Sequence, residues 1–243
     1  MSSTPSQSEN DDAGPVRFGP LEEFPGSLAS KVYHSLKHAI LSMAIRPGEI
    51  LRKGDICSQL NVSRSPVSEA MTRLAGEGLV DVVPQAGTFV SHFSMKEIRE
   101  GAFLREALEL QAIEQVAETI TEDQLKQLRR NLRVQEALVA DGDFTGFYEL
   151  DSEMHDLIMS FTGFHRVAQI AETSWLQVNR ARQLVLPDHG RVEETLAEHR
   201  RILDALEARD PEAARAATRA HLRQLICRLE PLERKHPELF QSK

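Results

Sequence analysis

The chain has 243 residues, of which 41% are hydrophobic and 27% are charged, an ordinary composition for a globular protein of one large or two modest domains. No apolar run approaches the roughly 20 residues of a membrane span, and the polar N-terminus lacks the apolar segment of a secretory signal. The two cysteines, Cys57 and Cys227, are far apart in the sequence and suggest no disulfide framework. We therefore expect a cytoplasmic protein that does not enter a membrane.

The net charge of −8 argues against nucleic-acid binding by the chain as a whole, but the distribution of charge is more informative than its sum. Residues 27–92 carry seven basic and five acidic side chains, whereas the segments on either side are acidic. Residues 1–26 carry one basic and five acidic side chains, which predicts a disordered acidic tail. Any DNA-binding surface is therefore expected within 27–92.

The basic segment contains helix signals followed by strand signals. Apolar spacing and the signals for helix starts and ends predict three helices, over residues 28–44, 53–60 and 64–77. Ser63 is the expected N-cap of the third helix and Gly78 its expected end. Two β-branched runs at 79–83 and 87–91, joined by a short turn, predict a hairpin. Three helices and then a hairpin predict a winged helix-turn-helix, an α+β domain, over 27–92.

Beyond His92 the sequence predicts helices alone. Ser94, Thr121, Asp143 and Asp210 are the expected N-caps, and Pro211 is expected at a first helical position. The expected helices span 94–118, 121–140, 143–160, 163–186, 191–208 and 210–229. Six helices with short links predict an all-α bundle over 94–232. Residues 233–243 are expected to be a C-terminal tail.

The DNA-reading residues are expected where the second helix of the helix-turn-helix begins, because that end enters the major groove. Arg64 has a forked, permanently charged head that can contact guanine O6 and N7 together. Ser63 and Ser65 can donate to phosphate, and Gly87 in the wing allows the backbone to approach DNA closely. The alternative is that Ser63 only caps the helix and Arg64 is solvated. The hairpin that follows favours DNA binding.

A metal site is the second hypothesis, and it concerns the helical half. Asp151 and His155 are four residues apart on one helix face, a spacing that is also common on exposed faces. His199 lies eleven residues before Asp210 and His221 eleven residues after it. If the last two helices form an antiparallel hairpin, both histidines lie about 16 Å from the turn and level with one another. One carboxylate and three imidazoles suit Zn²⁺, Ni²⁺, Mn²⁺ or Fe²⁺, with Zn²⁺ the first choice.

Four stretches of the N-terminal half carry a family pattern: PGEIL (47–51), LNVSRSPVSEAM (60–71), EGLV (77–80) and GTFV (87–90). On these stretches residues 28–91 resemble the DNA-binding domain of the GntR family of bacterial transcriptional regulators. The resemblance implies double-stranded operator DNA as partner and a homodimer. One departure is Ser68, where the family has an arginine that commonly contacts DNA. Its loss removes a charge-assisted contact worth about 1.5–3 kcal/mol, for which Arg73, Arg52 or Lys53 could compensate.

The helical half resembles the FCD effector domain of the FadR subfamily through ELDSEMH (149–155), AEHRRILDAL (197–206), RAHL (219–222) and REALE (105–109). The resemblance implies a metal ion held jointly by Asp151, His155, His199 and His221. It also implies that Arg105 binds a small carboxylate effector; the alternative is a solvated Arg105 that pairs with Glu109. Asn179 and Arg182 are weaker candidates for the effector pocket.

These patterns predict a transcription factor that responds to a metal and to a small organic acid, and not an enzyme. One alternative is a metal-dependent hydrolase-like enzyme fused to a DNA-binding module, because such ligands can activate water. No general base stands out beside the ligands, however, and the sequence has no HExxH motif. A second alternative is that the helical half only dimerises.

Overall fold

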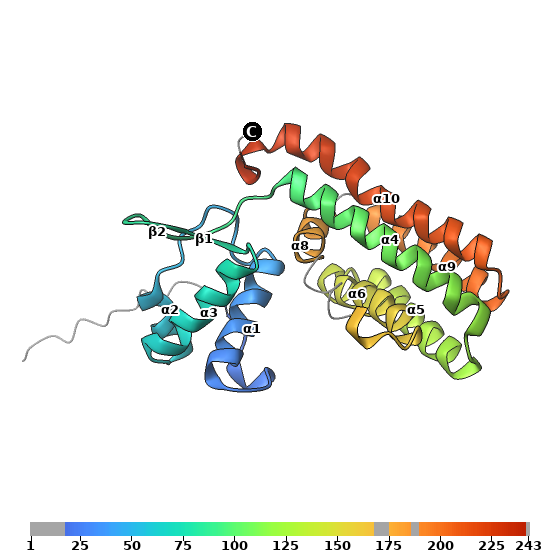
Figure 1. Cartoon of the computed structure of the whole chain (residues 1–243), viewed down its shortest axis with the longest axis horizontal. Coiled ribbons are helices and arrows are strands. Elements are labelled where there is room, and N and C mark those ends of the chain that lie inside the picture. Colours follow the sequence, from blue (N-terminus) through green and yellow to red (C-terminus); the bar gives the residue numbers. More distant parts are fainter. Residues whose placement is uncertain (1–17, 168–174, 186–189, 242–243) are drawn as a thin grey trace, which may run out of the picture.

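The computed structural model describes residues 18–167, 175–185 and 190–241. Figure 1 shows a small lobe that holds the first helices and both strands, and a longer lobe built from helices. The predicted fold class, a winged helix-turn-helix joined to an all-α bundle, is confirmed. Within the described ranges, no helix has both the length and the apolar character that crossing a membrane requires.

The small lobe is the winged helix-turn-helix. Its elements are α1 (Leu28–Leu41), α2 (Lys53–Leu60), α3 (Arg64–Gly76), β1 (Val80–Val83) and β2 (Gly87–Val90). The strands are antiparallel, with Val80 opposite Val90. The turn between α2 and α3 is tight because Asn61 adopts a left-handed conformation, with φ at 50°, which asparagine tolerates better than most residues do. Apolar side chains from α1 and α3 fill one core, among them Val32, Leu36, Val67 and Leu74.

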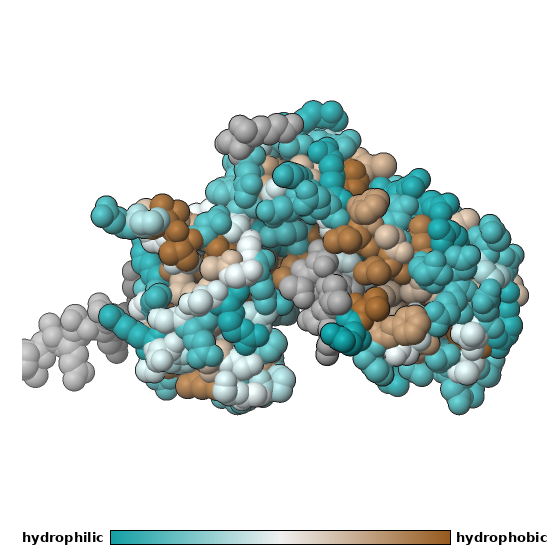
Figure 2. Space-filling model, viewed as in Figure 1, coloured by the Kyte–Doolittle hydropathy of each residue, from teal (hydrophilic) through white to brown (hydrophobic). Residues whose placement is uncertain are grey.

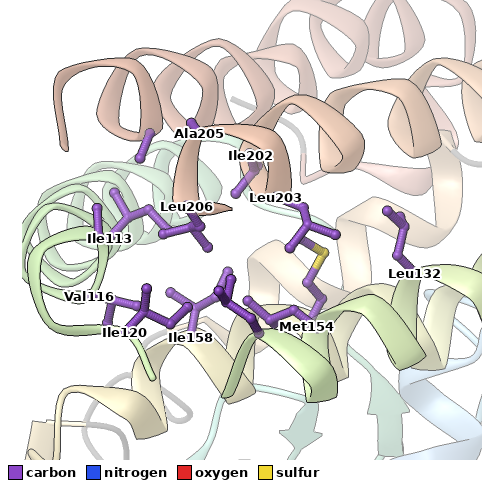
Figure 3. Packing of buried hydrophobic residues seen from close by; sticks show 14 of the residues in the cluster. Ile113, Val116, Ile120, Leu132, Met154, Ile158, Ile202, Leu203, Ala205 and Leu206 are labelled. Carbon is purple, nitrogen blue, oxygen red and sulfur yellow. The ribbon is translucent and has the colours of Figure 1, made fainter. Parts of the chain in front are cut away.

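The longer lobe consists of α4 (Met95–Thr119), α5 (Glu122–Asp141), α6 (Phe144–Phe161), α8 (Leu176–Val185), α9 (Arg191–Glu207) and α10 (Pro211–Lys235). As predicted, the side chains of Thr121, Asp143 and Asp210 cap their helices by accepting a hydrogen bond from a backbone N–H three residues on. Figure 3 shows how apolar residues of α4, α5, α6 and α9 interdigitate in the main core of this lobe. Helix α8 contacts α1 of the small lobe as well as α4 and α10, and lies between the lobes in Figure 1.

The predicted acidic tail is shorter than expected. Residues 1–17 lie outside the described ranges, but Phe18 is buried in the core of the small lobe. The Ser35 hydroxyl donates to the Gly19 carbonyl, and Leu21–Glu23 form a short 3-10 helix. The prediction of disorder is therefore wrong from Phe18 to Glu23, because a single aromatic residue in a polar stretch carries no periodicity that would mark its burial.

The predicted C-terminal tail is also wrong over 233–241. Helix α10 continues to Lys235, and the chain then returns to the linker between the lobes. Phe240 is buried against Phe93, with ring centroids 5.6 Å apart. The backbone N–H of Phe93 donates to Leu239, and that of Gln241 donates to the Phe93 carbonyl. The partner segment is about 150 residues away in the chain, so local patterns do not reveal this contact.

The helix predicted over 163–186 is not continuous. Residues 165–167 are helical, residues 168–174 lie outside the described ranges, and Trp175 is in a turn directly before α8. The Trp175 side chain is 4% exposed and packs with Ala112 and Met159. Burial of this large ring between α4 and α6 accompanies a break that the helical spacing does not predict.

Candidate functional site

The four predicted metal ligands meet in the interior of the longer lobe. Helix α6 supplies Asp151 and His155, α9 supplies His199, and α10 supplies His221. One ligand atom from each lies within 4.8 Å of those of the others, and all four side chains are buried. The rings of His199 and His221 have centroids 4.8 Å apart, so the two histidines are level across the α9–α10 hairpin as predicted. Exposure of the Asp151/His155 pair, the alternative interpretation, is excluded.

Each histidine of the cluster is oriented by an acceptor for its Nδ1 hydrogen. His155 donates to Glu109 at 2.7 Å, His199 donates to the Gln135 Oε1 at 2.8 Å, and His221 donates to Glu198 at 2.7 Å. An imidazole with its hydrogen on Nδ1 carries a bare lone pair on Nε2. All three rings can therefore present an Nε2 lone pair to the centre of the cluster. Histidines that bind a metal commonly donate their other ring N–H to such an acceptor, which fixes the tautomer.

The ligand atoms themselves lack the partners that buried polar atoms normally have. Among the described residues, neither Asp151 Oδ1 nor His199 Nε2 has a hydrogen-bond partner, and the two atoms lie 3.2 Å apart. The Nε2 atoms of His155 and His221 are 3.1 Å apart. Two bare lone pairs at this distance repel each other unless a cation lies between them. Two nitrogens bound to tetrahedral Zn²⁺ at 2.0–2.1 Å would be about 3.3 Å apart, so the residues present fit a metal ion.

The electrostatics favour neutral histidines beside ionised carboxylates. Burial lowers the pKa of both His199 and His221 well below the ordinary value. Burial alone would raise the pKa of Glu198, but hydrogen bonds from His221 and Arg191 outweigh it and lower that pKa to about 2. Glu109 follows the same pattern, because Arg105 and His155 lower its pKa against the effect of burial. Neutral imidazole is the form of histidine that binds metal.

Three arginines line a small cavity beside the cluster: Arg105, Arg182 and Arg191. Arg105 is 5% exposed and its Nε donates to Glu109 at 2.5 Å, so it pairs with Glu109 as the alternative proposed but inside the protein rather than in solvent. Arg191 donates twice to Glu198, at 2.8 and 3.0 Å. The cavity has a volume of about 40 Å³ and is also lined by Asp151 and His221.

The two weaker effector candidates on α8, Arg182 and Asn179, differ in their position relative to the cavity. Arg182 lines the cavity, and its Nη2 lies against Asp151 Oδ2 as an ion pair. Burial, followed by the neighbouring Arg105 guanidinium, lowers the pKa of Arg182 to about 10, so it remains charged at neutral pH. Asn179 is not among the described residues that line the cavity, and its carbonyl accepts a hydrogen bond from Tyr148.

On the small lobe, Ser63, Arg64 and Ser65 are exposed where α3 begins. Ser63 occupies the N-cap position with extended backbone, but its hydroxyl makes no capping hydrogen bond. A hydroxyl that is not used for capping remains available to a phosphate, and the N-terminus of α3 itself favours an anion. The geometry is therefore that of a helix-turn-helix whose reading end is uncovered.

Two further candidates for DNA binding differ in their surroundings. The Lys53 amine donates to Ser68 at 3.1 Å and is exposed, which brings a positive charge to the position where the GntR pattern has arginine. Arg73, in contrast, stacks on the Tyr33 ring at 3.7 Å from its centroid. Its guanidinium therefore covers α1 rather than joining Arg64 and Ser68.

Gly87 has a structural role that the sequence does not indicate. It is the first residue of β2, opposite Val83, and lies outside the turn of the wing. Its φ is +133°, and an added Cβ would approach the Ile50 side chain to 3.1 Å. Backbone conformation and the contact with Ile50 thus account for glycine here; approach to DNA stays a prediction.

Helix α8 connects the cavity with the wing. Arg182 lies on its cavity side, whereas Arg180 is fully buried and donates to the Ser91 carbonyl at 2.6 Å, directly after β2. The Arg180 guanidinium also covers the Phe93 ring at 4.4 Å, and Gln177 donates to the carbonyl of Gly78, two residues before β1, at 2.9 Å. One helix therefore contacts both the cavity and the two chain segments that lead into and out of the hairpin.

Known proteins share both halves of this architecture. Residues 28–90 match the gntR family of bacterial regulatory proteins, and residues 100–224 match the FCD domain. The chain belongs to the GntR family. It is 30% identical to the HTH-type transcriptional repressor RspR of Escherichia coli (strain K12) over 210 residues. The aligned region covers 86% of this chain and 92% of RspR. An HTH-type transcriptional regulator in an unstable DNA locus of Streptomyces ambofaciens is 33% identical over 209 residues, or 86% and 88% of the two chains.

Solved structures share the fold. E. coli McbR/YncC superposes with a TM-score of 0.75 at 23% identity, covering 86% of this chain and 99% of that one. A GntR transcriptional regulator from Rhodococcus sp. RHA1 superposes with a TM-score of 0.73 at 25% identity, covering 83% and 97%. These relatives are transcriptional regulators rather than enzymes, in agreement with the prediction. Because GntR regulators bind operator DNA, this chain is a DNA-binding transcriptional regulator with an FCD domain.

Sequence reasoning missed the residues that orient the histidines: Glu109, Gln135 and Glu198. Glu109 is the last residue of the REALE motif, and its spacing indicates only a pair with Arg105. Glu198 precedes His199 in the chain but bonds to His221, 23 residues away. The spacing carries no signal for Gln135, because its contact with His199 joins two helices 64 residues apart.

Proposed function

We propose that the FCD domain of this regulator binds one divalent metal ion through Asp151, His155, His199 and His221, with Zn²⁺ as the first choice and Ni²⁺, Mn²⁺ or Fe²⁺ as alternatives. The observation that carries the proposal is the pair of facing Nε2 atoms of His155 and His221, 3.1 Å apart, whose Nδ1 hydrogens are both held by carboxylates. Nitrogen donors with one carboxylate favour a metal of borderline softness.

We further propose that a small organic acid binds in the adjacent cavity and modulates operator binding. A bound metal ion supplies a Lewis-acid site for one carboxylate oxygen. Arg105 lines the same cavity, and a guanidinium there can take a second oxygen through a charge-assisted hydrogen bond. Asn179 enters this proposal only if the α8 region rearranges on binding, since it does not line the cavity as described.

The route from effector to DNA runs through α8 in this proposal. A ligand that changes the position of Arg182 acts on the helix whose Arg180 and Gln177 hold the ends of the wing. A coupling free energy of about 1–3 kcal/mol between effector and DNA is enough for regulation. The DNA-binding set comprises Ser63, Arg64, Ser65, Ser68, Lys53 and Gly87, with Arg73 the weakest member because it stacks on Tyr33.

The regulator is proposed to act in the cytoplasm as a homodimer on a palindromic operator, because dimers match half-sites about one helical turn apart. Figure 2 shows hydrophobic residues gathered on the visible face of the longer lobe. On α4, Phe103 is 74% exposed and Leu104 is 45% exposed, and exposed apolar side chains of this size favour a protein interface. Light scattering of the wild type and of Phe103→Asp tests the dimer; a monomeric wild type contradicts it.

Hydrolase activity is less well supported. Many metal-dependent hydrolases use a carboxylate beside the metal as general base. Near the cluster, Glu109 and Glu198 each hold both an imidazole and a guanidinium. Turnover of an ester or lactone panel that is lost in His199→Ala would support the enzyme.

The deciding experiment combines metal analysis with thermal unfolding of the full-length protein. We expect about one equivalent of divalent metal after mild purification, a lower melting temperature after chelation, and recovery when the metal is returned. A ligand at 100 times its Kd stabilises the folded state by about 2.7 kcal/mol, a shift that is easy to detect. A screen of small carboxylic acids with and without chelator then tests the effector. Absence of bound metal together with no shift from divalent cations would refute the metal proposal.

A further inference from the structure

The cavity beside the histidines is surrounded by an unusual number of buried charges. Six charged side chains form three pairs there: Arg105–Glu109, Arg182–Asp151 and Arg191–Glu198. All six are at most 9% exposed. Buried charges are costly unless they are paired, and without a metal ion these three cations and three anions balance.

We propose that the natural ligand of this cavity is a small dicarboxylate bound as a dianion, and that Arg182 selects for its second negative charge. The inference rests on the proposed function, because it assumes a divalent ion in the histidine cluster and an acid in the cavity.

The balance of charge around the cavity favours a dianion. A divalent ion among neutral histidines adds two positive charges to a set that is otherwise balanced. A monocarboxylate would leave one positive charge uncompensated in a buried site, whereas a dicarboxylate restores neutrality. Burial makes this difference large, because water does not screen charges there as it does at the surface.

The three arginines are not equivalent with respect to the metal. Glu109 and Glu198 are beside the metal ligands and can keep their guanidinium partners when a metal ion binds. Asp151, in contrast, is both the ion-pair partner of Arg182 and one of the four proposed metal ligands. A metal ion bound to Asp151 would compete with Arg182 for the one negative charge of this carboxylate. Arg182 is therefore the guanidinium that can best pair with an added anion.

The size of the cavity restricts the carbon chain of the ligand. Its volume of about 40 Å³ is far below the roughly 300–1,000 Å³ of sites for drug-sized ligands, which favours the smallest acids. The apolar residues Val185, Leu222 and Leu225 complete its lining and suit a short methylene chain rather than further hydroxyl groups. We therefore expect an acid of three or four carbons with a carboxylate at each end.

The test compares malonate with propionate, which have the same number of carbons but differ by one carboxylate. Binding to the full-length Zn²⁺-loaded protein is measured by titration calorimetry at neutral pH, with metal content determined on the same sample. We expect malonate to bind wild type at least tenfold more tightly than propionate. Arg182→Gln should weaken malonate at least tenfold and change propionate less than threefold.

Two variants serve as controls. Arg182→Lys keeps the charge and should keep a preference for malonate, which separates charge from shape. Arg200→Gln removes an exposed arginine of α9 that pairs with Glu136 at 2.9 Å, and should behave like wild type. If Arg182→Gln does not fold, the ratio of malonate to propionate affinity in wild type and in Arg182→Lys still decides the question.

The outcomes distinguish this inference from the function on which it rests. Equal affinity for malonate and propionate in wild type overturns the dianion and leaves a carboxylate sensor standing. Inorganic phosphate binding as tightly as malonate overturns the dicarboxylate assignment. Failure of every acid of either kind to bind the metal-loaded protein overturns both the proposed effector and this inference.

Discussion

Replacing Glu198 by glutamine tests whether the buried carboxylates tune metal binding by holding the histidines. Glu198 accepts a hydrogen bond from His221 at 2.7 Å and two more from Arg191. Glutamine has nearly the same shape but is neutral, and its amide NH2 group replaces one of the two oxygens that now accept hydrogen bonds, so at least one donor loses its acceptor. Loss of an outer-shell partner of this kind lowers metal affinity about 10–100-fold, which corresponds to about 1.4–2.7 kcal/mol.

The assay is competition for Zn²⁺ between the purified regulator and a chromophoric chelator, with circular dichroism to verify the fold. Glu194→Gln is the matched control, because Glu194 lies one turn earlier on α9, is 55% exposed at its side chain and contacts Arg191 at 3.6 Å. We expect Glu194→Gln to change Zn²⁺ affinity less than twofold. Equal effects of the two substitutions, or wild-type affinity in Glu198→Gln, would refute the role assigned to Glu198.

The remaining predictions concern DNA binding and stability. Arg64→Ala should weaken binding to an operator selected in vitro by about 1–3 kcal/mol, while Arg73→Ala, whose guanidinium stacks on Tyr33, should weaken it less than threefold; fluorescence anisotropy that ranks them the other way contradicts the assignment. Lys53→Ala should reduce the slope of the logarithm of the binding constant against the logarithm of salt concentration by about one. An unchanged slope would show that Lys53 does not contact phosphate. Phe240→Ala should lower the free energy of unfolding by about 3 kcal/mol in urea, toward the lower end for a buried phenylalanine because the C-terminal segment can detach; no change would mean that this segment does not hold the linker in solution.

The two domains could be predicted from the sequence because their signals are local. Spacing of apolar residues on α1 and α3, the caps at Thr121, Asp143 and Asp210, and the β-branched runs of the hairpin each depend on neighbours within a few residues. The level placement of His199 and His221 also followed from the chain, since rise per residue and one turn determine it.

Only the tertiary structure decided the contacts between distant segments. Glu109 and Glu198 lie in quoted motifs, but those motifs do not indicate that the two carboxylates hold histidines on other helices. Nothing near Phe240 in the sequence indicates its contact with Phe93. The same is true of Arg180, whose burial depends on where α8 meets the small lobe. Whether a carboxylate accepts a hydrogen bond from a histidine, or an arginine is buried, depends on how whole helices pack against one another. The local pattern on any one helix does not contain that information.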